Sequence, residues 1–293
     1  MVTAPDRAAF KRCRRQWDLG ARLRRNLEPI ESAIPASAPA QARRRQVREA
    51  LAVHYFPGMW AWDRAIVQPL VLKAAGPEAP FVERYLHWAV DVDDFEPLRV
   101  ETDFDARIPD PRGGDLATAG GWAVHHQGRA DALVIDEDRV RWLLVHRFGP
   151  WTDVDLLRLD ETAVTSAWAW EQTFLDTKVG GVLFNEITDD GRFRRSVVPL
   201  ARATIESAGR QLGTEALEML DPGLSVYPNP DPGHCGACPF LDPCTAMFEG
   251  QDAEVILARS FRPRPADEVQ EGRLGGATWS MGRGAAPPTF GRR

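Results

Sequence analysis

Apolar residues recur at roughly helical spacing through the first ninety positions. From Asp6 to Arg25 they include Phe10 and Cys13, and this period predicts a helix that turns Cys13 inward. A Pro/Ala/Ser linker follows at 29–40. Further helices are predicted at 41–55, 60–75 and 80–90. Residues 1–90 therefore form a mostly helical N-terminal part that carries the first cysteine.

The period changes to two in the middle of the chain. Alternating or β-rich segments at 98–104, 122–135 and 140–148 predict strands, and the acidic tripeptide 136–138 predicts a tight turn between the last two. The elements predicted next are a helix at 155–175, a hairpin of strands at 181–187 and 193–199, and a helix at 201–220.

This order of elements predicts an α/β fold in which helices flank a mixed central sheet. Residues 91–250 form its core and pack with 1–90 as one compact domain. After Phe261 the sequence becomes rich in Pro, Gly and Arg, and we predict a disordered tail at 251–293.

Composition narrows the classes of protein. A chain of 293 residues with 44% hydrophobic content can bury one substantial core. The absence of an eighteen-residue apolar run predicts no membrane span and, by default, a cytoplasmic location. The net charge of -6 argues against a protein coated in nucleic acid.

Basic residues are nevertheless concentrated at the N-terminus. Residues 1–50 hold 12 Lys and Arg against 5 Asp and Glu. Guanidinium groups suit phosphate oxygens, so Arg14, Arg15, Arg45 and Arg48 are candidate contacts to nucleic acid. The alternative is a solvated helix surface whose arginines pair with the acidic remainder.

Three of the four cysteines lie close together. Cys235, Cys238 and Cys244 form C-x2-C-x5-C, and Cys13 stands far earlier in the chain. Thiolates at short spacing can bind one soft metal centre, and Cys13 is the cysteine left to complete it. A [4Fe-4S] cluster accepts three close cysteines and a distant one. Zinc, with His234 as a further ligand, is the alternative, followed by disulfides or unrelated thiols.

Several of these features occur in a familiar order. Cys13 precedes Trp17 on the first helix, Gly128-Arg129-Ala130-Asp131 lies on a predicted strand, and C-x2-C-x5-C follows near the end. Residues 5–250 thereby resemble the RecB-like iron-sulfur nucleases of the PD-(D/E)xK superfamily, a branch with AddB-type helicase-nucleases and CRISPR adaptation nucleases. The resemblance implies a restriction-endonuclease-like sheet, chain ends clamped by an iron-sulfur cluster, and DNA as a partner.

The resemblance also implies a site for Mg²⁺ or Mn²⁺ that activates water for phosphodiester cleavage. Asp131 matches the family's aspartate on the second strand, and Glu101 matches an acid that contributes to the metal site. The third strand carries Val145 in place of the expected acid and Arg147 in place of the lysine. Valine cannot ligate a cation. The family's helix histidine falls near Arg48, so most of the catalytic set is changed.

Three functions follow as hypotheses. The first is a catalytically degenerate nuclease fold that binds nucleic acid or a DNA-repair or helicase partner, with Arg147 pairing with Asp131 in the place of the cation. The second is an active metal-dependent nuclease whose acid has migrated to Glu101 or Glu161. The third is a scaffold stabilised by zinc or an iron-sulfur cluster, without a nucleic-acid role.

Other side chains admit two interpretations. His54 is a possible substitute for the family histidine, but a lone histidine on a helix is more often structural. Four tryptophans at close spacing are typical of a core and less often of base stacking. They are Trp60, Trp62, Trp168 and Trp170.

Overall fold

The computed structural model describes residues 1–30 and 38–264, and Met1–Pro263 form one compact unit. Those of its first ninety residues that the structure describes are mostly helical, as predicted. The helices here are α1 (Ala4–Arg12), α2 (Arg14–Gly20), α3 (Ala38–His54), α4 (Arg64–Ala75) and α5 (Ala79–Val92), with 3₁₀ turns η1 (Pro57–Met59) and η2 (Gly76–Glu78). None of the helices within the described residues has the length and apolar content needed to cross a lipid bilayer.

Cys13 divides the single helix predicted from Asp6 to Arg25. Its backbone is extended (φ −158°, ψ 109°), so α1 ends before it and α2 begins after it. A capping box starts α1, because the Thr3 hydroxyl accepts a hydrogen bond from Asp6 N while the Asp6 carboxylate accepts one from Thr3 N. The Cys13 side chain is buried, which confirms the inward orientation expected from its period.

The central sheet is mixed and is built around β4. β4 pairs with β3 antiparallel along its whole length, with β5 antiparallel at its far end, and with β1 parallel at its start. β5 then pairs with β6 in parallel, and β6 with β7 antiparallel. These strands are β1 (Val2–Thr3), β3 (Phe95–Arg107), β4 (His125–Asp136), β5 (Arg141–Phe148), β6 (Gly181–Ile187) and β7 (Phe193–Pro199).

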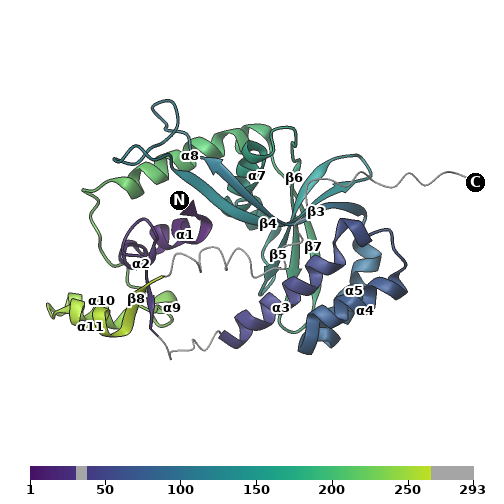
Figure 1. The fold of residues 1–293 in the computed structure, drawn as a ribbon, viewed down its shortest axis with the longest axis horizontal. Coiled ribbons are helices and arrows are strands. Elements are labelled where there is room, and N and C mark those ends of the chain that lie inside the picture. The colour runs from purple at the N-terminus through teal and green to yellow at the C-terminus, as the bar shows by residue number, and fades with distance from the viewer. Residues whose placement is uncertain (31–37, 265–293) are drawn as a thin grey trace, which may run out of the picture. The chain divides into compact units, whose positions relative to one another are not determined.

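Helices cover both faces of this sheet (Figure 1). On β5, Leu143 packs in a cluster with α7 residues such as Trp170, whereas its neighbour Leu144 packs in a second cluster with α3 residues such as Leu51. This alternation, the period of a strand, divides the core into two layers. The predicted α/β class with a flanked mixed sheet is confirmed. The helices of the first layer include α6 (Val154–Arg158), α7 (Glu161–Thr173) and α8 (Arg202–Leu220).

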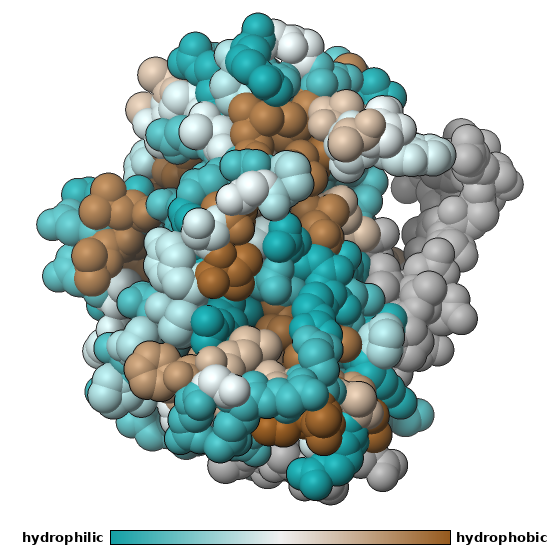
Figure 2. Space-filling view, turned by 90° about the vertical axis from the view of Figure 1, so that its left-hand side faces the viewer, coloured by the Kyte–Doolittle hydropathy of each residue, from teal (hydrophilic) through white to brown (hydrophobic). Residues whose placement is uncertain are grey.

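The segment after α8 returns to the first helices. α9 (Pro232–Cys235), α10 (Leu241–Phe248) and α11 (Ala253–Ser260) lie beside α2 (Figure 1). A short antiparallel ribbon joins β2 (Leu27–Pro29) to β8 (Phe261–Pro263). Figure 2 views the molecule from this side and shows separate apolar areas among hydrophilic ones.

The predicted start of a disordered tail at residue 251 is wrong. Residues of α11 and β8 are ordered because Leu257 and Phe261 pack with Leu19 and Phe240 in a small apolar cluster of their own. The sequence of this segment does not reveal its partner Leu19, which lies near the N-terminal end. Residues 265–293, where the rest of that prediction falls, lie outside the described residues.

Candidate functional site

Two acidic residues face each other across β3 and β4. The pairs Val100↔Ala132 and Thr102↔Ala130 flank Glu101 and Asp131, which therefore lie opposite one another. Glu101 has a positive φ of 43°, a left-handed conformation that is uncommon for a residue with a side chain. Such local strain persists only where surrounding contacts enforce it. The structure thus brings together both acids that the sequence proposed for one site.

The surroundings of Glu101 favour its protonated form. Burial raises the pKa of Glu101 to about 6, and the charge of Asp131 contributes to the increase. Arg129 opposes the shift, because its Nη1 lies 3.4 Å from Glu101 Oε2. Two neighbouring carboxylates with this electrostatic coupling are a common feature of cation sites.

A guanidinium group from α3 lies at this carboxylate pair. Arg48 Nε is 3.7 Å from Asp131 Oδ1, and Arg48 Nη2 donates a hydrogen bond to the carbonyl oxygen of His146 (2.9 Å). The second oxygen of Asp131 accepts a hydrogen bond from the backbone N–H of His146 (2.6 Å). Asp131 is therefore held by a fixed positive charge and by the neighbouring strand.

The predicted pair between Arg147 and Asp131 is wrong. Arg147 Nη1 lies 3.3 Å from Asp160 Oδ2, just before α7, and Val145 packs against the core layer of α7 and α8. Asp131 is contacted instead by Arg48, from a helix that packs on the opposite face of the sheet. The alternation of side chains along β5 directs Arg147 away from α3.

Two other predicted residues lie elsewhere. Glu161 at the start of α7 pairs with Lys11 and Arg7 of α1. His54 at the end of α3 lies 3.5 Å from Asp93, not beside Asp131. Of the four tryptophans, Trp168 and Trp170 are buried in the core, as their spacing favours, whereas Trp60 and Trp62 line a cavity.

A buried polar network next to the site was not anticipated. Asn185 of β6 donates a hydrogen bond to His146 Nδ1 (3.0 Å) and another to the Tyr85 hydroxyl. Burial lowers the pKa of His146 to about 4, so its ring is neutral at pH 7, and burial raises the pKa of Tyr85 to about 12. Arg195 extends the network by donating to Asp93 (2.7 Å) and to the Asn185 side-chain oxygen (3.3 Å).

One signal for this network was present in the sequence. Asn185 and Glu186 are polar residues in a strand whose residues are all buried, and His146 is a buried polar residue on β5. Polar side chains at such positions require hydrogen-bond partners. The partners of Asn185 come from α5, β5 and β7, so only the folded chain identifies them.

The predicted nucleic-acid contacts already have protein partners. Arg14 pairs with Glu218, Arg45 Nε lies 3.0 Å from Glu49, and Arg48 meets Asp131. Arg45 remains 71% exposed and its pair with Glu49 is a surface contact between adjacent helical turns. Pairs of this kind contribute little to stability and leave the guanidinium accessible.

The four cysteines come together from the two ends of the described chain. Cys13 lies between α1 and α2, Cys235 ends α9 and Cys244 lies in α10, and all four are free thiols. Burial raises the pKa of the Cys238 thiol, and the charges of the other three cysteines raise it further. The sulfur atoms are therefore near enough to interact electrostatically.

Two of these sulfur atoms accept hydrogen bonds. The backbone N–H of Asp231 donates to Cys235 Sγ (3.4 Å), and Arg15 Nη1 donates to Cys244 Sγ (3.7 Å). Such N–H donors stabilise thiolates and tune iron-sulfur clusters. His234 Nε2 is hydrogen-bonded to the carbonyl oxygen of Asn229 (2.9 Å). Among the residues of the described ranges, no three His, Cys, Asp or Glu side chains lie close enough to hold a metal as they stand.

Comparisons with known proteins identify no family. No model of a known protein family matches the chain, and no curated protein matches it. The solved structure described as "Crystal structure of SSO0001" is similar with a TM-score of 0.35 and 15% identity, over 72% of this chain and 97% of that one. A similarity of this size assigns no function.

Glu101 should make stability depend on pH. Its pKa rises from 4.5 in the unfolded chain to about 6 in the fold, so between these values the folded state binds more protons. The free energy of unfolding should therefore fall as pH rises from 4.5 through 6, by about 1 to 2 kcal/mol. Glu101→Gln should remove this fall in urea titrations at pH 4.5 and 7.5.

The matched control is Asp103→Asn. Asp103 lies two residues along the same strand and also pairs with Arg129, but it is half exposed. This variant should keep the pH dependence of the wild type. An unchanged pH dependence in Glu101→Gln would contradict the assignment.

Proposed function

We propose that this chain is a RecB-like nuclease-fold protein whose metal site has degenerated and which binds nucleic acid or a DNA-processing partner. The observation that carries the proposal is the contact between Arg48 and Asp131 (3.7 Å). A guanidinium at this place supplies the positive charge that a bound cation otherwise supplies to the carboxylate. Val145 adds no oxygen ligand to the pair of acids.

The topology supports the same proposal. A meander of β3, β4 and β5 is followed by a crossover through α6 and α7 to β6, which is parallel to β5. The acids Glu101 and Asp131 lie on the first two strands of this meander. The same strands are those on which the nuclease resemblance implies them.

An active nuclease is the second candidate, and one observation favours it. Glu101 and Asp131 lie opposite each other, and the charge of Asp131 contributes to the raised pKa of Glu101. A divalent cation with two acidic ligands and several waters is physically possible for Mg²⁺. It requires Arg48 to move away from Asp131.

Cleavage assays separate the two candidates. We expect purified wild-type protein to leave labelled single- and double-stranded DNA intact in Mg²⁺ or Mn²⁺. Arg48→Ala should bind Mn²⁺ at least tenfold more tightly than the wild type in calorimetry, because removal of one guanidinium exposes the carboxylates. The added substitution Asp131→Asn should abolish that gain. Wild-type cleavage that Asp131→Asn abolishes would establish an active nuclease instead.

Binding to DNA should depend on Arg45 and on salt. Arg45→Glu should weaken binding of a labelled single strand about tenfold at low salt in fluorescence anisotropy, because phosphate contacts release counterions. Arg158→Glu is the matched control, since Arg158 is also an exposed helix arginine in a surface pair with Asp155. If the two variants weaken DNA binding equally, or if the wild type does not bind DNA, the proposed nucleic-acid role is wrong.

We further propose that Cys13, Cys235, Cys238 and Cys244 hold a [4Fe-4S] cluster. When bound, such a group cross-links the first helices to the last ones. Closing so long a loop costs only slightly more entropy than closing a short one, so the binding free energy adds to the stability of the fold. Arg15 and the Asp231 N–H would then donate to cluster-bound sulfur. Zinc held with His234 is the alternative.

Metal content tests this assignment directly. Anaerobically purified protein should carry about four irons per chain and a brown chromophore. Cys13→Ser should lose the iron and lower the melting temperature, whereas His234→Ala should keep both. Loss of metal in His234→Ala with retention in Cys13→Ser, or zinc without colour, would overturn the iron-sulfur assignment.

A further inference from the structure

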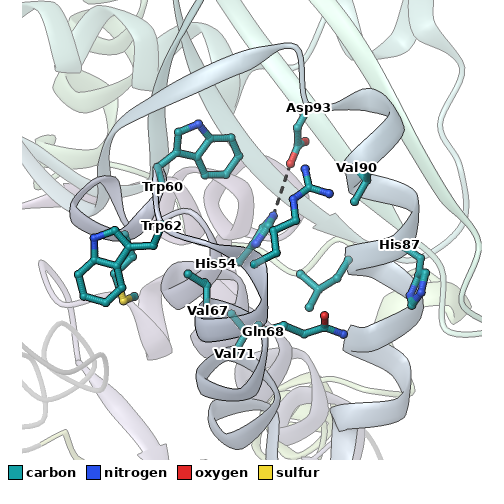
Figure 3. Close-up of a pocket in the computed structure, with 12 residues that line it drawn as sticks. His54, Trp60, Trp62, Val67, Gln68, Val71, His87, Val90 and Asp93 are labelled. Atoms are coloured by element: carbon teal, nitrogen blue, oxygen red, sulfur yellow. Dashed lines mark ion pairs between the residues drawn. The ribbon is translucent and has the colours of Figure 1, made fainter.

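A cavity of about 390 Å³ opens on the helical layer that carries α3, α4 and α5. Its volume lies in the range of small-molecule sites, and apolar walls with a few polar groups are typical of them. Figure 3 shows the end of α3, the loop after it, α4 and α5 around this space. The lining residues used below are His54, Trp60, Trp62, Arg64, Gln68 and Asp93.

One side of the cavity is aromatic. Trp60 and Trp62 come from the loop between α3 and α4, and Figure 3 shows both indoles on the same side of His54. The Trp60 ring is held in place by stacking on Phe95 (centroids 6.3 Å apart, planes at 14°). Trp62 is 51% exposed. A rigid indole and an accessible one together favour a flat ligand.

His54 lines the cavity, and its ring is turned toward Asp93 (Figure 3). Its Nε2 lies 3.5 Å from Asp93 Oδ2, yet this buried nitrogen has no hydrogen-bond partner in the part of the chain that the structure describes. Gln68 on α4 adds a carboxamide, which can both donate and accept.

The charges around the cavity argue against a cationic ligand. Asp93 is already neutralised, because Arg195 Nη1 lies 2.7 Å from its carboxylate and the Tyr55 hydroxyl donates to it (3.2 Å). Arg64 also lines the cavity, is exposed, and has no ion-pair partner among the described residues. The free charge is therefore positive, which favours an anionic group on the ligand.

We propose that this cavity binds the base of a nucleotide, with the heterocycle against Trp62, a hydrogen bond to Gln68 and the phosphate toward Arg64. A nucleobase combines a flat face with donors and acceptors at its edge, and base stacking on an aromatic side chain is strong and tolerant of sequence. The aromatic side, the Gln68 carboxamide and the free guanidinium each match one part of this ligand.

The ligand can come from two sources, a free mononucleotide or a base of a single strand. His54 follows Arg48 by six residues on α3, which is about 9 Å along the helix axis. A strand with one base in the cavity could therefore pass near Arg48. This second source rests on the proposed function, whereas the first does not.

Calorimetry with adenosine and thymidine 5′-monophosphates tests the first source. Anisotropy with a labelled oligothymidylate, and with the same strand carrying abasic sites, tests the second. Trp62→Ala should weaken binding of the ligand that occupies the cavity about tenfold or more. Gln68→Leu keeps the approximate size of the side chain, removes the carboxamide, and should weaken binding about tenfold without lowering the melting temperature.

Trp122→Ala is the matched control, because Trp122 is a more exposed tryptophan outside the cavity. It should leave both affinities unchanged. Weaker mononucleotide binding in the two cavity variants supports the first source, and weaker strand binding in them, lost with abasic sites, supports the second. Absent or unaltered binding of both probes overturns the inference. Strand binding that responds to Arg45→Glu but to neither cavity variant would retain the proposed function and overturn this inference alone.

Discussion

Burial of β4 and β5 on both faces is what the other parts of this fold depend on. Side chains of these strands alternate between a cluster under α7 and α8 and a cluster under α3 and α5. Each helical layer is positioned by one face, and the energy of that burial is the main stabilising term available to a domain of this size. The positions of Asp131 and His146, at the level where α3 crosses the sheet, follow from this arrangement.

The carboxylates of Glu101 and Asp131 illustrate how a fold accommodates two neighbouring acids. Two acids opposite each other on neighbouring strands repel, and burial increases the cost of charging both. Arg48 reduces that cost from one side and Arg129 from the other. Removing one of these arginines therefore changes the site more than removing an exposed arginine elsewhere.

The polar network around Asn185 connects this site with the cavity on the helical layer. Asn185 donates a hydrogen bond to His146, whose backbone N–H donates one to Asp131. Arg195 donates hydrogen bonds to both Asn185 and Asp93. Asp93 is shared with the cavity, where His54 approaches it. Buried hydrogen bonds of this kind have strict geometry, so the cavity and the carboxylate pair have fixed positions relative to each other within this unit.

Patterns among neighbouring residues were enough to predict most helices and strands of this protein and the acids Glu101 and Asp131 of its candidate site. The hydrophobic period specified helices and strands, because it depends on neighbours in the chain. Side-chain pairing was not predictable in this way. Arg48 rather than Arg147 meets Asp131, and α11 packs on α2, because residues far apart in sequence meet only when the sheet and its two layers assemble. Periodicity gives the direction of a side chain within its own element, whereas its partner depends on which element packs opposite.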